Sequence, residues 1–317
     1  MKIEFKRILC ATDLSEFSNH AVSYAMALAK QFEASLFLCH VIDLPIVSVH
    51  GAAYTYPQDY VDGLREEAAR KLRILVGGRV IDWEPIVTTG PVANTISGLI
   101  ANKAADLAIA ATHGRSGLKR LILGSVTERL IRTVNCPLLV VTSPEEGHDA
   151  ETVQQAGFKN ILVGCDFSAD SAAALQYGFS LAQEFQSVLH LVHVIEPVAY
   201  REVLLPPGLL DDVKTNLDKH LTAQLEELAP EEAKNWCEVK TTCLAGRPFE
   251  ELTKYAALHS VDLVVLGVRG RGLVETMLLG ATTDRVLRRV SCPVLSVSPL
   301  KLSKKTGIAD MAAAETL

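Results

Sequence analysis

The stretch from residue 111 to 125 follows an apolar segment, passes through a glycine-rich loop and begins a helix: Ala-Thr-His-Gly-Arg-Ser-Gly-Leu-Lys-Arg-Leu-Ile-Leu-Gly-Ser. A related stretch at residues 267–281 is Gly-Val-Arg-Gly-Arg-Gly-Leu-Val-Glu-Thr-Met-Leu-Leu-Gly-Ala. Glycines leave room for a phosphate to approach backbone N–H groups, and the dipole of the next helix favours negative charge. The sequence therefore predicts two copies of one phosphate site; the alternative is a tight turn that binds nothing.

Many other residues recur at a constant offset. Up to Trp83 the offset is 153 residues, and from Gly90 onward it is 156, because three extra residues, best placed at 243–245, enter the second copy. A repeat this long predicts a duplicated domain rather than a solenoid. The predicted domains are residues 1–143 and 157–300, with a linker at 143–155 and a peripheral tail after residue 300.

Within the first copy, short continuous apolar runs alternate with helical patterns. The predicted strands are 7–11, 35–42, 84–88, 107–111 and 138–141, and the predicted helices are 15–32, 60–76, 92–102 and 125–134. A polar and aromatic loop through Tyr54 and Pro57 separates the second strand from the second helix. Continuous rather than alternating apolar strands indicate a parallel sheet covered on both faces. The predicted fold class is α/β, with two tandem, doubly wound, five-stranded parallel-sheet domains.

Composition excludes several classes of partner. The net charge of −6 argues against nucleic acid, since its binders carry clustered positive charge. Charges such as Lys103 and Asp262 interrupt the apolar runs and no signal-peptide pattern is present, so we expect a cytoplasmic protein without a membrane span. Seven cysteines without a Cys-x-x-Cys pair indicate reduced core residues rather than disulfides or a zinc site.

Polar residues and glycines fall where ligands bind in open parallel sheets, beyond the carboxyl ends of the strands. Asp13 and Asp166 each follow a first strand, where a carboxylate can accept hydrogen bonds from adenine or ribose; the alternative is a helix cap, for which Ser15, Ser18, Ser168 and Ser171 compete. His40 and His193 end apolar strands, and a structural role is favoured over metal ligation. Neither a Walker motif, a Rossmann glycine motif nor a recognisable catalytic triad is present.

His113 in the first loop matches Arg269 in the second. Arginine cannot act as a general base at neutral pH, so the shared role of these two residues is contact with a ligand.

These motifs resemble the universal stress protein family, whose ATP-binding members carry Gly-x-x-Gly, nine residues, then Gly-Ser or Gly-Thr. The second copy has both first glycines but Ala281 at the end, whereas the first copy has Ser125 but Ala111 at the start. The closing segments Cys136-Pro137 and Cys292-Pro293, each followed by apolar residues, also look like the family's last strand. The resemblance spans about residues 5–142 and 158–298, and it implies an adenine nucleotide alpha hydrolase-like fold.

The resemblance also implies a function and its site. It implies a stress-response protein that binds ATP or AMP, with or without Mg²⁺, and that acts as a sensor or regulator through an unidentified protein partner. Family members pair through the last strand, which implies an internal pseudo-dimer and leaves a homodimer as a further option. Two alternatives stay open: a nucleotide-free adaptor, and an enzyme that hydrolyses ATP or phosphorylates itself on Ser116 or Ser125. The binding residues that the resemblance implies are listed here together with the matched pair His113 and Arg269. In the first copy they are Asp13, Val41, Ala111, His113, Gly114, Gly124, Ser125 and Val126, and in the second copy they are Asp166, Val194, Gly267, Arg269, Gly270, Gly280, Ala281 and Thr282.

Overall fold

A computed structural model describes residues 3–45, 47–49, 52–54, 56–112, 123–142, 157–196, 207–270 and 279–299. The chain divides into two compact units, one of residues 4–154 and one of residues 155–317 joined by residues 1–3. The predicted linker at 143–155 and the tail after residue 300 lie outside the described residues. The domain limits at 143 and 157 and the internal pseudo-dimer stay predictions.

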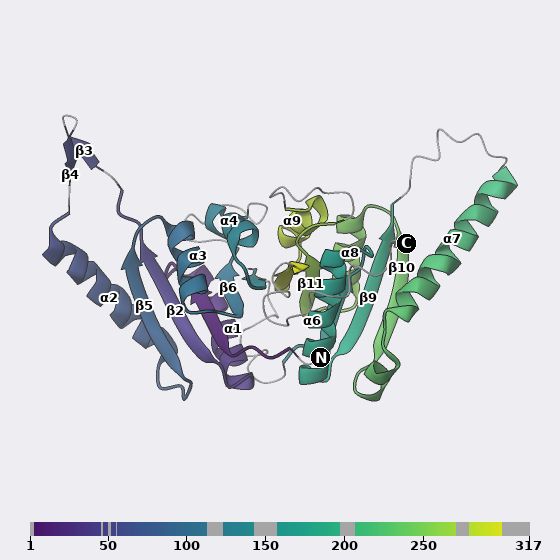
Figure 1. Ribbon diagram of the computed structural model, residues 1–317, viewed down its shortest axis with the longest axis horizontal. Coiled ribbons are helices and arrows are strands. Elements are labelled where there is room, and N and C mark those ends of the chain that lie inside the picture. Colours follow the sequence, from purple (N-terminus) through teal and green to yellow (C-terminus); the bar gives the residue numbers. More distant parts are fainter. Residues whose placement is uncertain are drawn as a thin grey trace, which may run out of the picture. The chain divides into compact units, whose positions relative to one another are not determined.

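The first half is a five-stranded parallel sheet in the order β7-β6-β1-β2-β5. Helices α1 and α2 pack on one face, and α3 and α4 on the other (Figure 1). The order reverses between β1 and β6, so the loops after these two strands diverge and leave a crevice. The elements are β1 (Arg7–Ala11), α1 (Glu16–Gln31), β2 (Ser35–Ile42), β3 (Val47–Val49), β4 (Ala52–Tyr54), α2 (Gln58–Val76), β5 (Trp83–Thr89), α3 (Val92–Asn102), β6 (Leu107–Ala111), α4 (Ser125–Thr133) and β7 (Leu138–Val141).

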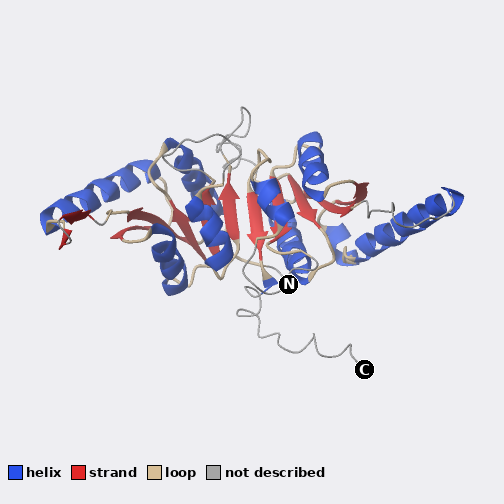
Figure 2. Ribbon diagram, turned by 90° about the horizontal axis from the view of Figure 1, so that it is seen from above, coloured by secondary structure: helices blue, strands red, loops and turns tan. Residues whose placement is uncertain are grey.

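The second half repeats this topology in the order β10-β9-β8-β11-β12, again with all of these strands parallel. Figure 2 shows helices on both sides of the strands in each half. The predicted fold class is therefore confirmed. The elements are β8 (Asn160–Gly164), α6 (Ala169–Phe185), β9 (Val188–Ile195), α7 (Pro207–Glu227), the 3-10 helix η2 (Glu231–Asn235), β10 (Val239–Ala245), α8 (Pro248–Leu258), β11 (Leu263–Gly267), α9 (Ala281–Leu287) and β12 (Val294–Val297).

The repeated core explains why the two halves fold alike. Phe5 packs edge-on against Phe32 at 5.2 Å between ring centroids, and the matching Phe158 and Phe185 repeat this contact at 5.2 Å. Asp106, only 6% exposed, accepts backbone hydrogen bonds from residues 6 and 7 and so fixes the start of β1. A carboxylate can be buried where backbone N–H groups donate hydrogen bonds to it.

One part of the first half differs from the predicted loop. Between β2 and α2, the short strands β3 and β4 form an antiparallel pair, in which Val47 lies opposite Tyr54. Three-residue strands give too short a pattern to be distinguished from a loop by hydrophobic periodicity.

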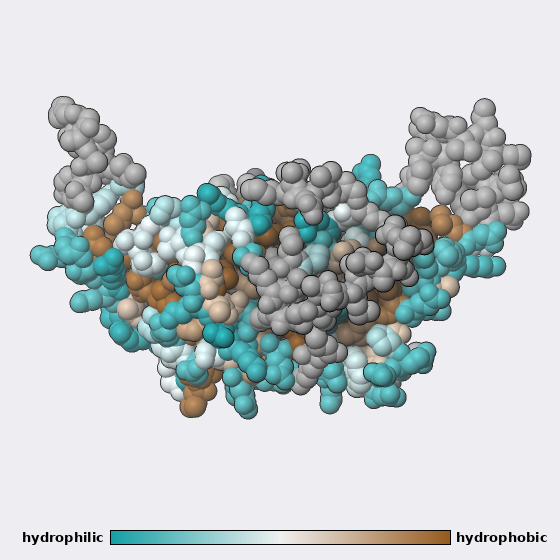
Figure 3. Space-filling model, viewed as in Figure 1, coloured by the Kyte–Doolittle hydropathy of each residue, from teal (hydrophilic) through white to brown (hydrophobic). Residues whose placement is uncertain are grey.

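The surface and the cysteines agree with the composition. Figure 3 shows hydrophilic side chains spread over the visible face of the described residues, and no described helix is both long and apolar enough to cross a membrane. All seven cysteines are free thiols. Five of them are buried, and burial raises the pKa of Cys39 to about 12, so this thiol stays protonated and packs as an apolar group.

Candidate functional site

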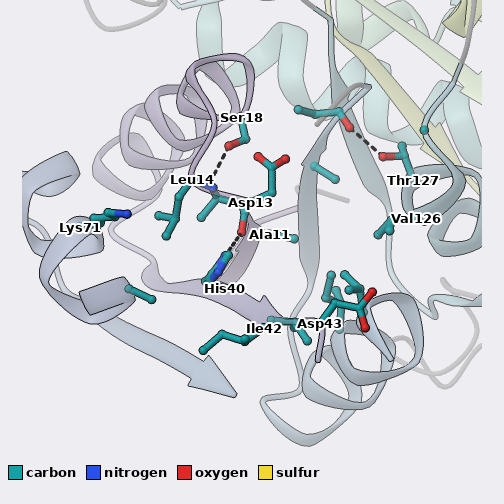
Figure 4. A pocket seen from close by; sticks show the side chains of 18 of the residues that line it. Ala11, Asp13, Leu14, Ser18, His40, Ile42, Asp43, Lys71, Val126 and Thr127 are labelled. Atoms are coloured by element: carbon teal, nitrogen blue, oxygen red, sulfur yellow. Dashed lines mark hydrogen bonds between the residues drawn. The ribbon is translucent and has the colours of Figure 1, made fainter. Parts of the chain in front are cut away.

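A cavity of about 600 Å³ lies beyond the carboxyl ends of β1, β2 and β6 in the first half, at the predicted crevice (Figure 4). This volume is typical of small-ligand sites, which span about 300 to 1,000 Å³. Six predicted binding residues line it together: Asp13, Val41, Ala111, Gly124, Ser125 and Val126. The other two first-half residues, His113 and Gly114, lie outside the described residues.

Asp13 is held by the turn between β1 and α1. Its Oδ1 atom accepts hydrogen bonds from the backbone N–H of Ser15 at 3.0 Å and from the Ser15 hydroxyl at 2.6 Å. Ser15 caps α1, so the alternative that Asp13 is the helix cap is wrong. Between them, Leu14 adopts φ 64°, and its match Phe167 adopts φ 60°. This left-handed conformation is uncommon outside glycine, so both halves keep the same strained turn at the crevice.

Gly124 closes the turn from β6 to α4. Its N–H donates to the carbonyl oxygen of Thr112 at 2.8 Å, and a Cβ atom added to Gly124 would lie 2.9 Å from that same oxygen. Its φ of −61° suits any residue, so close approach of the backbone, and not φ, requires glycine. Thr127 strengthens the turn by donating its hydroxyl to the carbonyl of Ala111 at 2.7 Å.

The first turn of α4 offers donors to the cavity. Gly124 is the N-cap and supplies no side-chain hydrogen bond, whereas Ser15 caps α1 with its hydroxyl. The first N–H groups of a helix have no partner within the helix, and with the helix dipole they favour an anion. Ser125 is exposed and lines the cavity. This end of the cavity is therefore suited to a phosphate group.

Helix α2 contributes side chains that the sequence prediction missed. Leu64, Glu67, Ala68 and Lys71 all line the cavity, and their spacing of three and four residues places them on one helix face. That spacing was the available signal. The Lys71 ammonium lies 2.7 Å from the Glu67 carboxylate and holds the pKa of that carboxyl below its usual value. Figure 4 shows Lys71 extending from α2 towards the cavity.

The two strand-end histidines make hydrogen bonds with the backbone. His40 Nδ1 lies 2.9 Å from the carbonyl oxygen of Thr12, and His193 Nδ1 lies 2.7 Å from that of Cys165. These contacts fit the predicted structural role. In the described part of the chain, no cluster of three or more His, Cys, Asp or Glu side chains could hold a metal ion.

The second half places its predicted residues at the matching strand ends, with different contacts. Asp166 accepts a hydrogen bond from the N–H of Ser168 at 3.0 Å, and Ser168 caps α6, so here too the aspartate is not the cap. Gly280 donates to the carbonyl of Val268 at 2.8 Å, as Gly124 does in its own half. Val194 is half-buried on β9, Gly267 ends β11, and Ala281 and Thr282 begin α9.

Arg269 is the main difference. Its guanidinium and its backbone N–H are both directed at Asp170, with N···O distances of 3.1 to 3.4 Å. The sequence could not reveal this pair, because the two residues are 99 positions apart.

The family model described as the universal stress protein family matches residues 4–142 and again residues 157–298. The chain belongs to this family. Both matches coincide with the repeated α/β halves, so the chain carries two universal stress protein domains in tandem.

Individual relatives agree with this architecture. A universal stress protein of Mycolicibacterium smegmatis is 27% identical over 302 residues, which cover 92% of this chain and 97% of the relative. One from Methanocaldococcus jannaschii is 31% identical over 144 residues, or 45% of this chain and 85% of the relative. Among solved structures, a universal stress protein from Archaeoglobus fulgidus covers 94% of this chain and all of its own, with a TM-score of 0.64. The two sequences are 22% identical, and at this level the structural likeness shows a shared fold.

Proposed function

We propose that this universal stress protein binds an adenine nucleotide, ATP or AMP, in the first-half cavity, and that the bound state regulates an unidentified protein partner. The observation that carries the proposal is the convergence of Asp13, Val41 and the first turn of α4 on one cavity of about 600 Å³. A carboxylate beside an apolar wall suits adenosine, and an open helix N-terminus suits phosphate.

The two ends of the cavity have different chemistry, which orients the ligand. Asp13 after β1, Asp43 after β2 and Glu67 on α2 line the cavity. Lys71 offsets the charge of Glu67, so it is the carboxylates of Asp13 and Asp43 that disfavour a phosphate beside them. The N–H groups at the start of α4 favour a phosphate beside Gly124 and Ser125. The base and ribose therefore belong beside Asp13 and Val41, and the phosphates belong beside Gly124 and Ser125. Mg²⁺ would reduce the repulsion between phosphates and these carboxylates.

The direct test is calorimetric titration of the full chain with ATP, ADP and AMP, with and without Mg²⁺. One solved universal stress protein was determined in complex with cAMP, which enters the titration as a fourth ligand. We expect micromolar affinity, or about 8 kcal/mol, for at least one adenine nucleotide. Absence of binding heat, together with purification of a protein that releases no nucleotide on denaturation, would favour the adaptor function instead.

Ser125→Ala is expected to weaken nucleotide binding by about 0.5 to 1.5 kcal/mol, because it removes one neutral hydroxyl donor while keeping the backbone N–H groups of α4. Ser125→Thr is the matched control, since it keeps the hydroxyl at the same position and should retain most of the affinity. Titration of ATP and AMP into both variants measures the effect. Equal affinities of the alanine and threonine variants, both well below the parent, would show that shape rather than the hydroxyl matters there.

A further inference from the structure

The second half contains an ion pair between a buried Asp170 and a half-buried Arg269 beside its candidate site. Asp170, in the first turn of α6, is 6% exposed, and the side chain of Arg269 is 19% exposed. Asp170 Oδ2 accepts from the Arg269 backbone N–H at 3.1 Å and from Nε at 3.3 Å, while Oδ1 accepts from Nη2 at 3.4 Å. One carboxylate therefore binds both the side chain and the backbone of the segment that follows β11.

Close packing fixes the same segment. A Cβ atom added to Gly267 would lie 2.7 Å from Asp170 Cβ, so β11 ends directly against the first turn of α6. A Cβ atom added to Gly270 would lie 2.8 Å from Asp166 Oδ2. The segment 267–270 is thus held against the two acidic residues that precede and begin α6. It lies where the predicted contacts to ribose and phosphate would have to form.

The first half lacks this carboxylate. The residue 153 positions before Asp170 is Phe17, which is 42% exposed and does not line the first-half cavity. The two halves share a fold but differ in the charge that faces the segment after the fourth strand.

We infer that the Asp170 carboxylate occupies the position beside the Arg269 guanidinium where a phosphate group would bind. The second half therefore binds a polyphosphate anion only when that anion displaces the Asp170 carboxylate from the guanidinium. The ligand class rests on the proposed function. Carboxylate and phosphate both suit the guanidinium fork, and they compete for it. Asp170 competes for the Arg269 guanidinium more effectively than a free anion because it is part of the same chain. Its displacement also leaves a buried carboxylate without its cation. Asp170 acts through Arg269 and is a positioning residue.

The test is Asp170→Asn, made in a Gly124→Val background that obstructs the first-half site and titrated with tripolyphosphate and with ATP. Asparagine keeps the shape of the side chain but removes the competing charge. We expect each anion to bind at least about tenfold more tightly than to the Gly124→Val parent. A further Arg269→Gln change should abolish the gain. Glu238→Gln is the matched control, because it breaks the Glu238–Lys240 pair at the start of β10, at the edge of the sheet opposite the carboxyl ends of the strands, and should not increase affinity.

A second measurement needs no nucleotide. Hydrogen exchange of a peptide that covers residues 267–270 should be faster in Asp170→Asn than in the parent, because the Arg269 N–H loses its charged acceptor. Asp170→Ser is the second variant if the asparagine protein does not fold. Faster exchange and tighter tripolyphosphate binding, with no ATP binding to the chain that keeps Gly124, would refute the proposed nucleotide function and leave the inference standing. Unchanged exchange, or anion affinity that is unchanged or lower in the variant, would overturn the inference.

Discussion

Gly124→Val is expected to lower the affinity of the first half for adenine nucleotide by at least about tenfold, or about 1.4 kcal/mol. The new Cβ would lie 2.9 Å from the carbonyl oxygen of Thr112, and a backbone atom cannot move aside as a flexible side chain can. The turn must shift, and α4 begins at the next residue, so its N–H groups move away from the phosphate position. Overpacking of this kind also costs about 1 to 3 kcal/mol of stability.

Gly280→Val is the matched control for this experiment. A Cβ atom at position 280 would lie 3.1 Å from the carbonyl oxygen of Val268, in the equivalent turn of the second half. The two variants should lose similar thermal stability, but only Gly124→Val should lose nucleotide affinity at the first-half cavity. Titration of ATP together with thermal unfolding separates the two effects. Equal loss of affinity in both variants would point to general destabilisation rather than to the first-half site.

The fold was predictable because its information is local and occurs twice. Continuous apolar runs such as 107–111 are strands in both the prediction and the structure, and Pro91 correctly placed the start of α3. The constant offsets then predicted the second half from the first. The exceptions are segments where the copies differ, such as β3 and β4, for which no second copy supports the pattern.

The candidate site was predictable where backbone geometry determines it, and unpredictable where side chains from distant elements meet. Gly124 must be glycine because a Cβ atom would lie 2.9 Å from a carbonyl oxygen, and the same contact at Gly280 is tight at 3.1 Å. The repeated spacing of these glycines reveals both turns. Lys71 and Glu67 line the cavity only because α2 packs over β5 and β2, which the sequence does not state. The Asp170–Arg269 pair depends on the rotation of α6 against β11. The shared glycine spacing of the two loops therefore does not reveal that their surroundings differ.

Lowering the pH from 7 to 4.5 is expected to remove about 2 kcal/mol of stability from the second half through one histidine. His190 on β9 is 2% exposed, and desolvation is the main reason that its pKa falls from 6.5 to about 4. Electrostatic interactions with His259 and Lys240 lower the pKa of His190 further, while Glu238 raises it. Its Nδ1 lies 3.0 Å from the Tyr255 hydroxyl, and its Nε2 is buried without a hydrogen-bond partner among the described residues.

The sign follows from the two protonation equilibria. The unfolded chain takes up a proton on His190 near pH 6.5, whereas the folded chain does so only near pH 4. Between these values protonation favours unfolding, so stability is complete above pH 6.5 and falls as the pH is lowered towards 4. The full difference corresponds to about 3 kcal/mol. Below pH 4 this histidine contributes no further loss.

His190→Phe should remove this component of the pH dependence. The residue 153 positions earlier is Phe37, so the first half already has phenylalanine in the equivalent strand position. Tyr255 would keep a partner, because its hydroxyl also lies 3.3 Å from Thr242 Oγ1. The measurement is urea unfolding at pH 7 and 4.5 in a Trp83→Phe background, where Trp236 alone reports on the second half.

The comparison that decides this prediction is the difference between the two pH values, not the stability at either one. Carboxylates titrate in the same range and lower the stability of every variant, so only the loss specific to His190 distinguishes the parent from His190→Phe. His220→Gln, an exposed position on α7, should retain the parental loss. If His190→Phe loses as much stability as the parent between pH 7 and 4.5, the buried imidazole is not the group that couples protonation to unfolding of the second half.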